Sequence, residues 1–323
     1  MSARTAIILT SYNRPHLVVD AIESVFEQED QDWRLYIMDD GSLPETTDAI
    51  RATIEKRYHW SSLNVYLGVG MVSEYGEAGG RGVTVAWGPS RSAGERKRTI
   101  SYSYQINKAL TFLLHEERYV TYLCDDDYFY PESVGARAAH LDEHPDRHVV
   151  FGRTRSVEYN SDGAYNAWRE HHATIGHVTP GRHYPRPTGP TIKHERGVYV
   201  TKFERGELDP ETGLDYVDEG FWRYGPIVYA RDGHTDHNQV MHRRSCLLGV
   251  NGPCREWPQH GPGTSQREFW PEDPKRWDVG DLGFFTLLSE PAGHMFWGID
   301  SWVCTKRFHA KSDGLTAETT LRE

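Results

Sequence analysis

The sequence is poor in cysteine, in positive charge and in long apolar runs. Its 323 residues include four cysteines, which show neither CxxC spacing nor the density of a disulfide scaffold. The formal net charge of -11 at pH 7 argues against broad charge-driven binding to nucleic acid or to anionic membranes, although it allows a local basic groove. No apolar run approaches the roughly 18 residues of a membrane span, and no signal segment opens the chain. These absences favour a reduced, cytoplasmic enzyme.

What is present indicates a globular α/β protein. Hydrophobic residues make up 37% of the chain and aromatic residues 12%, enough for a large core. Residues 5–9 form a continuous apolar run that predicts a strand buried on both faces, and Pro15 stands where a helix would begin. A second strand at 35–38, a helix at 44–57 and a third strand at 63–67 are expected. Strands alternating with helices predict a mostly parallel sheet that binds ligands at its carboxyl edge.

Two acidic runs follow predicted strands. Asp39 and Asp40 follow the second strand, and residues 124–127 (Cys-Asp-Asp-Asp) follow an apolar strand at 119–123. Crowded carboxylates repel one another unless a cation neutralises them, so a divalent metal that holds a diphosphate is one reading. The other reading is a solvated acidic loop. Because both runs lie at carboxyl ends of strands, we expect them to meet in one crevice.

Two segments interrupt this pattern. Residues 68–98 are rich in glycine and end in a basic cluster, which indicates either a solvated surface loop or a mobile lid whose cations approach a diphosphate. Residues 159–224 are rich in His, Tyr, Trp, Pro and Gly, which is typical of substrate-specific walls. Order returns near 239–244, the last strand-like run is 294–304, and a polar tail is expected from 306. The basic cluster comprises Arg91, Arg96, Lys97 and Arg98.

Five motifs in order resemble those of the family 2, inverting, GT-A glycosyltransferases. They are residues 10–13 (Thr-Ser-Tyr-Asn), 38–42 (Met-Asp-Asp-Gly-Ser), 125–127 (Asp-Asp-Asp), 240–245 (Val-Met-His-Arg-Arg-Ser) and 280–285 (Gly-Asp-Leu-Gly-Phe-Phe). The resemblance implies an α/β GT-A fold, a Rossmann-like mostly parallel sheet flanked by helices, with a mixed acceptor-side half.

The resemblance also implies a division of the chain. Residues 1–127 would form the nucleotide-sugar-binding half. Residues 128–305 would form the acceptor-binding and catalytic-base half of the same continuous domain. Residues 306–323 would be a C-terminal tail.

The resemblance assigns nucleotide contacts to the first two turns. Tyr12 would supply an aromatic face for a uracil or thymine ring, Thr10 a backbone or hydroxyl contact, and Asp40 an acceptor for the ring N3–H. Asp39 could serve the ribose. The alternative for the aspartate pair is an Asx turn that begins the next helix.

The third motif would hold the metal. Asp126 aligns with the family's metal ligand, and Asp125 would hold the ribose or a metal-bound water. Asp127 adds a further carboxylate, and Cys124 stands where many relatives carry another aspartate, so the ligand register is open by one residue. Mn²⁺ or Mg²⁺ suits an oxygen site that shares its coordination with phosphate.

The resemblance implies that Asp281 is the catalytic base, which takes the proton of the acceptor hydroxyl as its oxygen attacks the anomeric carbon. Asp278 is the rival base, and either residue could instead cap a helix. His309 could approach the diphosphate, as could the cation of Arg98. His242 lies in the acceptor-side motif, where a buried, hydrogen-bonded histidine is expected.

These expectations describe a metal-dependent, inverting, hexosyltransferase-type enzyme. It would move a sugar from a UDP- or dTDP-sugar to a hydroxyl of a saccharide or small natural product. One rival acceptor is a hydroxymethylated base in DNA, which the acidic charge disfavours. Another rival is a nucleotide-sugar-binding module without transferase activity. A sugar nucleotidyltransferase is disfavoured because residues 10–15 form no Gly-rich loop.

Overall fold

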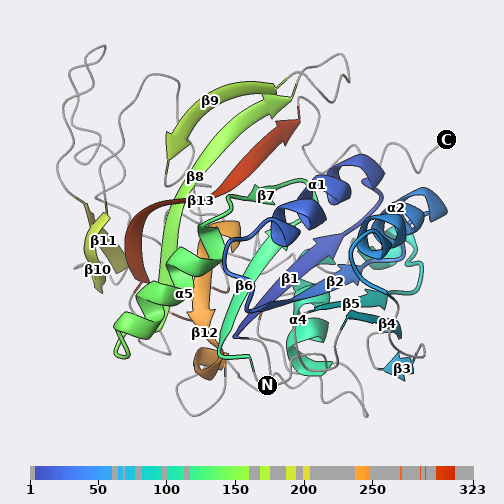
Figure 1. Cartoon of the computed structure of the whole chain (residues 1–323), viewed down its shortest axis with the longest axis horizontal. Helices are drawn as coiled ribbons and strands as arrows, with labels where there is room; N and C mark the ends of the chain where they lie inside the picture. The colour runs from blue at the N-terminus through green and yellow to red at the C-terminus, as the bar shows by residue number, and fades with distance from the viewer. Residues whose placement is uncertain are drawn as a thin grey trace.

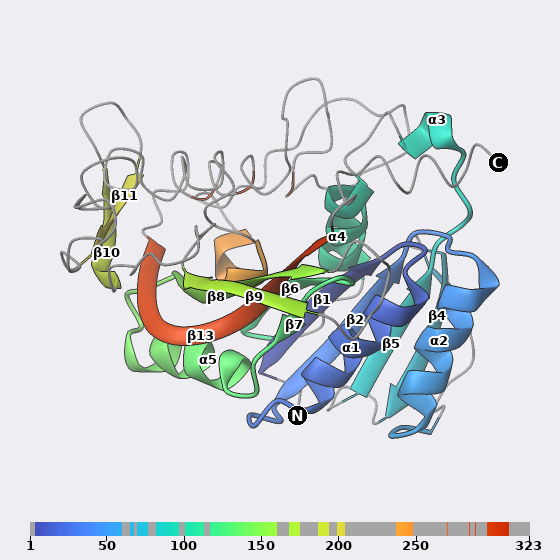
Figure 2. The same ribbon diagram turned by 90° about the horizontal axis from the view of Figure 1, so that it is seen from above.

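A sheet with helices on both faces forms the core of the protein (Figures 1 and 2). The computed structural model describes residues 4–59, 65–67, 70–76, 82–96, 101–112, 117–159, 168–174, 187–193, 199–203, 237–247, 270, 284, 288 and 296–309. Within this part of the chain, no helix is long and apolar enough to cross a membrane.

Four parallel strands form the centre of the sheet, in the order β6-β1-β2-β5. Their carboxyl ends are aligned, since Thr10 of β1 pairs with Cys124 of β6 and Ser11 pairs with Asp39 of β2. This alignment brings both acidic runs to one edge of the sheet. The strands are β1 (Thr5–Ser11), β2 (Trp33–Asp39), β5 (Gly82–Trp87) and β6 (Tyr119–Cys124).

Alternating side chains of these strands pack into two hydrophobic cores, one on each face of the sheet. Ile7 and Leu9 of β1 pack with the apolar stripes of α1 and α2 on one face, where α5 also lies, whereas Ala6 and Ile8 pack with α4 on the other. Figures 1 and 2 show α1, α2 and α5 on the face opposite α4. The helices are α1 (Pro15–Phe26), α2 (Pro44–Glu55), α4 (Ser101–Phe112) and α5 (Ser133–Glu143).

The expectation of a loop or lid across 68–98 is wrong for most of that segment. Strand β5 joins β2 in parallel, and β4 (Gly70–Gly76) pairs with β5 in antiparallel orientation. Val83 and Val85 are fully buried, so this glycine-rich segment contains a strand with one face in the hydrophobic core. Gly82 serves close packing, because a Cβ there would lie 2.4 Å from the Tyr75 carbonyl oxygen. The short elements β3 (Val65–Leu67) and α3 (Ala93–Arg96) flank these strands in the chain.

The other half of the sheet is mixed, as expected. β12 (Val240–Arg243) runs antiparallel between β6 and β8 (Val149–Tyr159). β13 (Phe296–His309) lies parallel to β8 and continues to His309, so the predicted tail from 306 begins too early. The remaining elements are β7 (Tyr128–Phe129), β9 (Trp168–Thr174), β10 (Pro187–Lys193), β11 (Tyr199–Phe203), η2 (His237–Gln239) and η3 (Arg244–Leu247).

Candidate functional site

The turns after β1, β2 and β6 are joined at the carboxyl edge of the sheet. The backbone N–H of Asp125 donates to the Thr10 carbonyl oxygen (3.2 Å), and that of Asp40 donates to the Ser11 carbonyl oxygen (2.9 Å). The Asp125 Oδ2 atom accepts a hydrogen bond from the backbone N–H of Tyr12 (2.8 Å). The structure therefore brings together residues that the sequence assigned to nucleotide and metal binding from three separate motifs.

The aspartate after β2 forms the Asx turn that the sequence left open. Asp39 Oδ2 accepts hydrogen bonds from the backbone N–H groups of Gly41 (3.1 Å) and Ser42 (3.0 Å). Gly41 has φ of +73°, a conformation in which a side chain is strained. Burial raises the pKa of Asp39, although these hydrogen bonds oppose the shift. One oxygen of Asp39 thus shapes the turn that presents Asp40.

Asp40 is buried and held by two donors. Arg91 Nη2 donates to Oδ2 (2.9 Å), and Gln105 Nε2 donates to Oδ1 (2.5 Å). Arg91 is fixed in turn by Ser101 Oγ (2.7 Å) and lies over the ring of Tyr104, 4.7 Å from its centroid. The sequence left Arg91 either in a solvated loop or among cations that approach a diphosphate; in the structure it contacts the Asp40 carboxylate. Gln105 was missed because it lies in a helix identified only by its apolar residues.

Arg14 bridges two carboxylates of the turn after β6. Its Nη1 atom lies 2.8 Å from Asp125 Oδ1 and 2.8 Å from Asp126 Oδ2. Burial raises the pKa of Asp125 to about 6, and the Arg14 charge opposes that shift. The Asp125 carboxylate in turn raises the pKa of Arg14. The sequence analysis missed this cation, although Arg14 directly follows one of its motifs.

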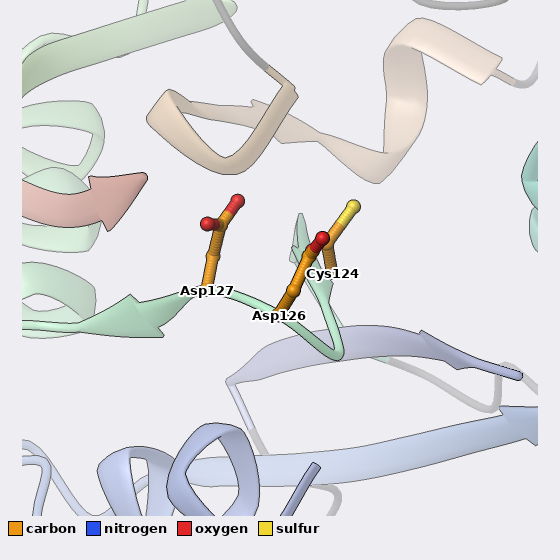
Figure 3. Close-up of side chains that lie close together, drawn as sticks. All are labelled: Cys124, Asp126 and Asp127. Atoms are coloured by element: carbon orange, nitrogen blue, oxygen red, sulfur yellow. The ribbon is translucent and has the colours of Figure 1, made fainter. Parts of the chain in front are cut away.

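Three possible metal ligands lie together in the same turn. The ligand atoms of Cys124, Asp126 and Asp127 all lie within 4.8 Å of one another. Figure 3 shows the three side chains projecting to one side of the turn, toward the segment that contains β12. Two carboxylates and one sulfur atom at this spacing fit a divalent cation. Asp125, held by Arg14 and Tyr12, is not part of this group.

The segment at the start of η2 supports that turn. Asn238 Oδ1 accepts a hydrogen bond from the Cys124 backbone N–H (3.0 Å), while its Nδ2 donates to the carboxylate of Asp127. His237 Nε2 lies 3.0 Å from Cys124 Sγ, and the ring of Tyr102 stacks on His237. Burial raises the pKa of the Cys124 thiol to about 12. No sequence signal pointed to Asn238, which lies 111 residues from Asp127.

Arg137 lies beneath Asn238. Its Nη1 atom donates to the Asn238 carbonyl oxygen (3.2 Å), the Val240 carbonyl oxygen (3.3 Å) and Thr121 Oγ1 (2.8 Å). Burial lowers the pKa of this fully buried guanidinium to about 10. The contacts connect α5 to β6 and to the start of β12, so they fix the position from which Asn238 reaches the acidic turn.

The remaining predicted residues fall elsewhere. Asp281, Asp278 and Arg98 lie outside the described residues. His309 ends β13, and its side chain is also outside them. His242 is buried, with Nε2 2.7 Å from the Tyr122 hydroxyl and Nδ1 2.9 Å from the Arg243 carbonyl oxygen, so it has the expected buried, hydrogen-bonded position.

Comparisons with known proteins agree with this arrangement. Residues 6–66 match the model of glycosyl transferase family 2, which supports a family 2 glycosyltransferase. Protein CgeD of Bacillus subtilis (strain 168) is 25% identical over 292 residues, 90% of this chain and 47% of CgeD. The chain therefore spans about half the length of that relative.

Solved structures give the fold. TarS of S. aureus matches with a TM-score of 0.50 at 14% identity, covering 95% of this chain and 37% of TarS. The mannosyltransferase PcManGT of Pyrobaculum calidifontis, solved with GDP-Man and Mn²⁺, matches with a TM-score of 0.48 at 13% identity, covering 100% of this chain and 61% of its own. The architecture is the α/β GT-A type. The sequence motifs also predict closeness to the spore-coat polysaccharide glycosyltransferase SpsA, and that prediction remains to be tested.

Proposed function

We propose that the protein is a metal-dependent, inverting glycosyltransferase that moves a hexose from a UDP- or dTDP-sugar to an acceptor hydroxyl. The observation that carries the proposal is the meeting of three turns at one edge of the sheet. Tyr12, Asp40 and the turn at 124–127 come from separate motifs of the family 2 resemblance, and residues 6–66 match that family.

The turn after β2 would recognise the base. A uracil or thymine ring presents an N3–H donor between two carbonyl acceptors. Asp40 offers a buried acceptor, and Arg91 and Gln105 place donors beside it. Tyr12, which is partly buried one turn away, would supply a stacking face. Thr10 and Asp39 would contact the nucleoside through the neighbouring turns.

The turn after β6 would hold the diphosphate end of the donor. Asp126 and Asp127 would bind Mn²⁺ or Mg²⁺, which when bound supplies a Lewis acid for the departing nucleoside diphosphate. Asp125 is oriented by the Tyr12 N–H and by Arg14, so it would present its carboxylate toward the ribose side. Arg14 would keep the charge of the turn balanced while the donor arrives.

Asp281 is the proposed base, with Asp278 as the rival. Support comes from Phe284, which follows Asp281 by three positions. Phe284 is fully buried, and its ring centroid lies 5.9 Å from that of Tyr122 in β6. That contact lies two residues before Cys124 along the strand. A single carboxylate that deprotonates the acceptor oxygen as it attacks the anomeric carbon gives inversion.

The acceptor would be a saccharide or a small natural product, and the reaction would take place in the cytoplasm. The support for that location is that the described cysteines, Cys124, Cys246 and Cys304, are free thiols, as a reducing compartment would keep them. His309 and Arg98 would approach the diphosphate, and His242 would lie on the acceptor side.

A donor panel tests the proposal. Binding and hydrolysis of UDP-, dTDP- and GDP-sugars would be measured with Mn²⁺ and with EDTA, for the wild type and for Asp281→Asn and Asp278→Asn. We expect metal-dependent binding of a uridine or thymidine donor in all three proteins. Turnover should fall about 10²–10⁴-fold in Asp281→Asn alone, the usual contribution of a general base.

Failure to bind any sugar nucleotide would overturn the proposal. Binding without turnover on any hydroxyl acceptor would instead indicate a nucleotide-sugar-binding module. Loss of turnover in Asp278→Asn, with Asp281→Asn active, would transfer the role of base to Asp278.

A further inference from the structure

The metal cluster contains a sulfur atom, which separates it from an all-oxygen site. Cys124 Sγ lies within 4.8 Å of the ligand oxygens of Asp126 and Asp127, and all three side chains project to the same side of the turn (Figure 3). Two of the three candidate ligands are hard carboxylates and the third is a soft thiol. Ligand softness governs which divalent cation such a site prefers.

The surroundings hold Cys124 in the cluster. Asn238 binds both the backbone N–H of Cys124 and the carboxylate of Asp127, so one side chain fixes the spacing between the sulfur-bearing residue and an oxygen ligand. His237 Nε2 contacts the sulfur itself at 3.0 Å, and the ring of His237 is held by Tyr102. The Asn238 contacts therefore fix the backbone at Cys124, and the His237 contact fixes the sulfur atom itself.

Arg14 and Asn238 contact different carboxylates of the turn. Arg14 neutralises Asp125 and contacts one oxygen of Asp126, on the side of β1. Asp127 is contacted by a neutral group, since its carboxylate accepts a hydrogen bond from the amide of Asn238. A divalent cation bound by Cys124, Asp126 and Asp127 would be attracted by the two carboxylates of this group.

We propose that Cys124 Sγ is a ligand of the divalent cation together with Asp126 and Asp127, and that this mixed set selects Co²⁺ or Zn²⁺ over Mg²⁺, with Mn²⁺ between them. The thiol proton leaves to solvent when the sulfur binds the cation. The order follows the general preference of N, O and S sites for later first-row metals and the preference of Mg²⁺ for oxygen. The inference rests on the proposed function only in taking residues 124–127 as the cation site.

Cobalt titration of the full-length, tag-free protein tests the inference without any activity measurement. A Co²⁺–thiolate bond gives a charge-transfer absorption in the near ultraviolet, whereas Co²⁺ on carboxylates alone does not. We expect this band in the wild type with one-to-one stoichiometry and its loss in Cys124→Ser. Cys246→Ser is the matched control, since Cys246 is a buried free cysteine away from the cluster, and it should keep the band.

Metal selectivity gives the second readout. Cys124→Asp should lower the affinity for Co²⁺ and Zn²⁺ relative to Mg²⁺ by about 10–100-fold. Mutation of a residue that only supports a metal ligand already has an effect of this size. Zinc X-ray absorption of the wild type needs no variant, and it should show one sulfur scatterer at about 2.3 Å. That measurement keeps the test valid even if the Cys124 variants fail to fold.

The outcomes separate this inference from the proposed function. Metal-dependent donor binding with no charge-transfer band and no Zn–S scattering would overturn the sulfur ligand and leave the glycosyltransferase proposal intact. A band and a Zn–S signal without binding of any sugar nucleotide would support the sulfur ligand and overturn the function.

Discussion

The turns after β2 and β6 flank β1 at the same edge of the sheet, yet their carboxylates have different partners. Asp39 accepts hydrogen bonds from backbone N–H groups, and Asp40 accepts them from Gln105 and from the guanidinium of Arg91. The turn at 124–127 has Arg14 on one side and a cluster of two carboxylates and a thiol on the other. The carboxylates of the first turn are held by hydrogen-bond donors, which fits the base recognition proposed above, whereas the second turn has a group of side chains that could hold a cation.

This difference shows that neighbouring acidic motifs at one sheet edge do not carry the same chemistry. Both motifs contain consecutive aspartates at the carboxyl end of a strand. They differ in the side chains that contact those aspartates. Variants that alter one turn should therefore give effects different in kind from variants in the other.

The largest effect is expected at the turn after β6. Asp126→Ala removes a proposed metal ligand, and donor turnover should fall at least about 10²–10³-fold because several kcal/mol of charge stabilisation on the leaving group is lost. Turnover at saturating Mn²⁺ measures it. Asp48→Asn, at an exposed position of α2, is the control and should match the wild type. Equal turnover in Asp126→Ala would mean that the two turns do not differ as described.

A smaller effect is expected at the turn after β2. Asp40→Asn replaces a charged acceptor with an amide, and the dissociation constant for UDP should rise about 10–100-fold, the range for one hydrogen bond to a charged group. Mn²⁺ binding in the absence of nucleotide should not change, since Asp40 is not in the metal cluster. Calorimetric titration measures both. A loss of Mn²⁺ affinity would contradict the separation of the two turns.

Arg14 tests how the second turn is balanced without a metal. Arg14→Gln leaves the carboxylates of Asp125 and Asp126 without their shared cation, so the metal-free protein should lose about 1–2 kcal/mol of unfolding free energy. This value lies between those of surface and buried pairs, because the Arg14 side chain is 37% exposed. Saturating Mn²⁺ should restore most of the loss in a thermal or urea titration. An equal loss with and without Mn²⁺ would show that Arg14 only packs.

The smallest effect is expected at His140, which lies away from both turns. Its titration contributes to the pH dependence of stability independently of the two turns. Burial and the neighbouring Arg147 and His144 lower the pKa of His140 to about 4. The unfolded chain therefore binds more protons between about pH 6.5 and 4, so this contribution to stability is present above pH 6.5 and is lost as pH falls toward 4.

His140→Gln should remove that acid sensitivity. A full shift corresponds to about 3 kcal/mol, and the partial exposure of the ring reduces it to about 1–2 kcal/mol. Urea titrations at pH 7 and pH 4.5 measure the difference. An unchanged pH dependence would assign acid sensitivity to other groups, including the two turns.

Local patterns predicted much of the framework. Pro15 begins α1 as expected, the apolar positions of that helix are buried, and α2 begins at Pro44. The strands at 35–38 and 119–123 were found with their acidic ends at one edge. Each of these depends on periodicity and on residues next to one another in the chain, which the sequence displays directly.

The errors arose where glycine content outweighed strand periodicity. Residues 82–87 read as part of a loop, yet β5 pairs with β2 along its whole length, because the burial of Val83 and Val85 against α1 and α2 outweighs the flanking glycines. The sequence left Arg91 open between a solvated loop and a lid near a diphosphate, since nothing local specifies which group a cation in a loop contacts. Its partner, Asp40, lies 51 residues earlier.

The sequence by itself determined the alternation of strands and helices and the acidic ends of β2 and β6, because these depend on local apolar spacing and turn residues. Only the tertiary structure decided which cation or amide each carboxylate received. Arg14, Arg91 and Asn238 reach their partners across 111, 51 and 111 residues. Contacts of that separation depend on the order and register of strands in the sheet, which local spacing does not specify.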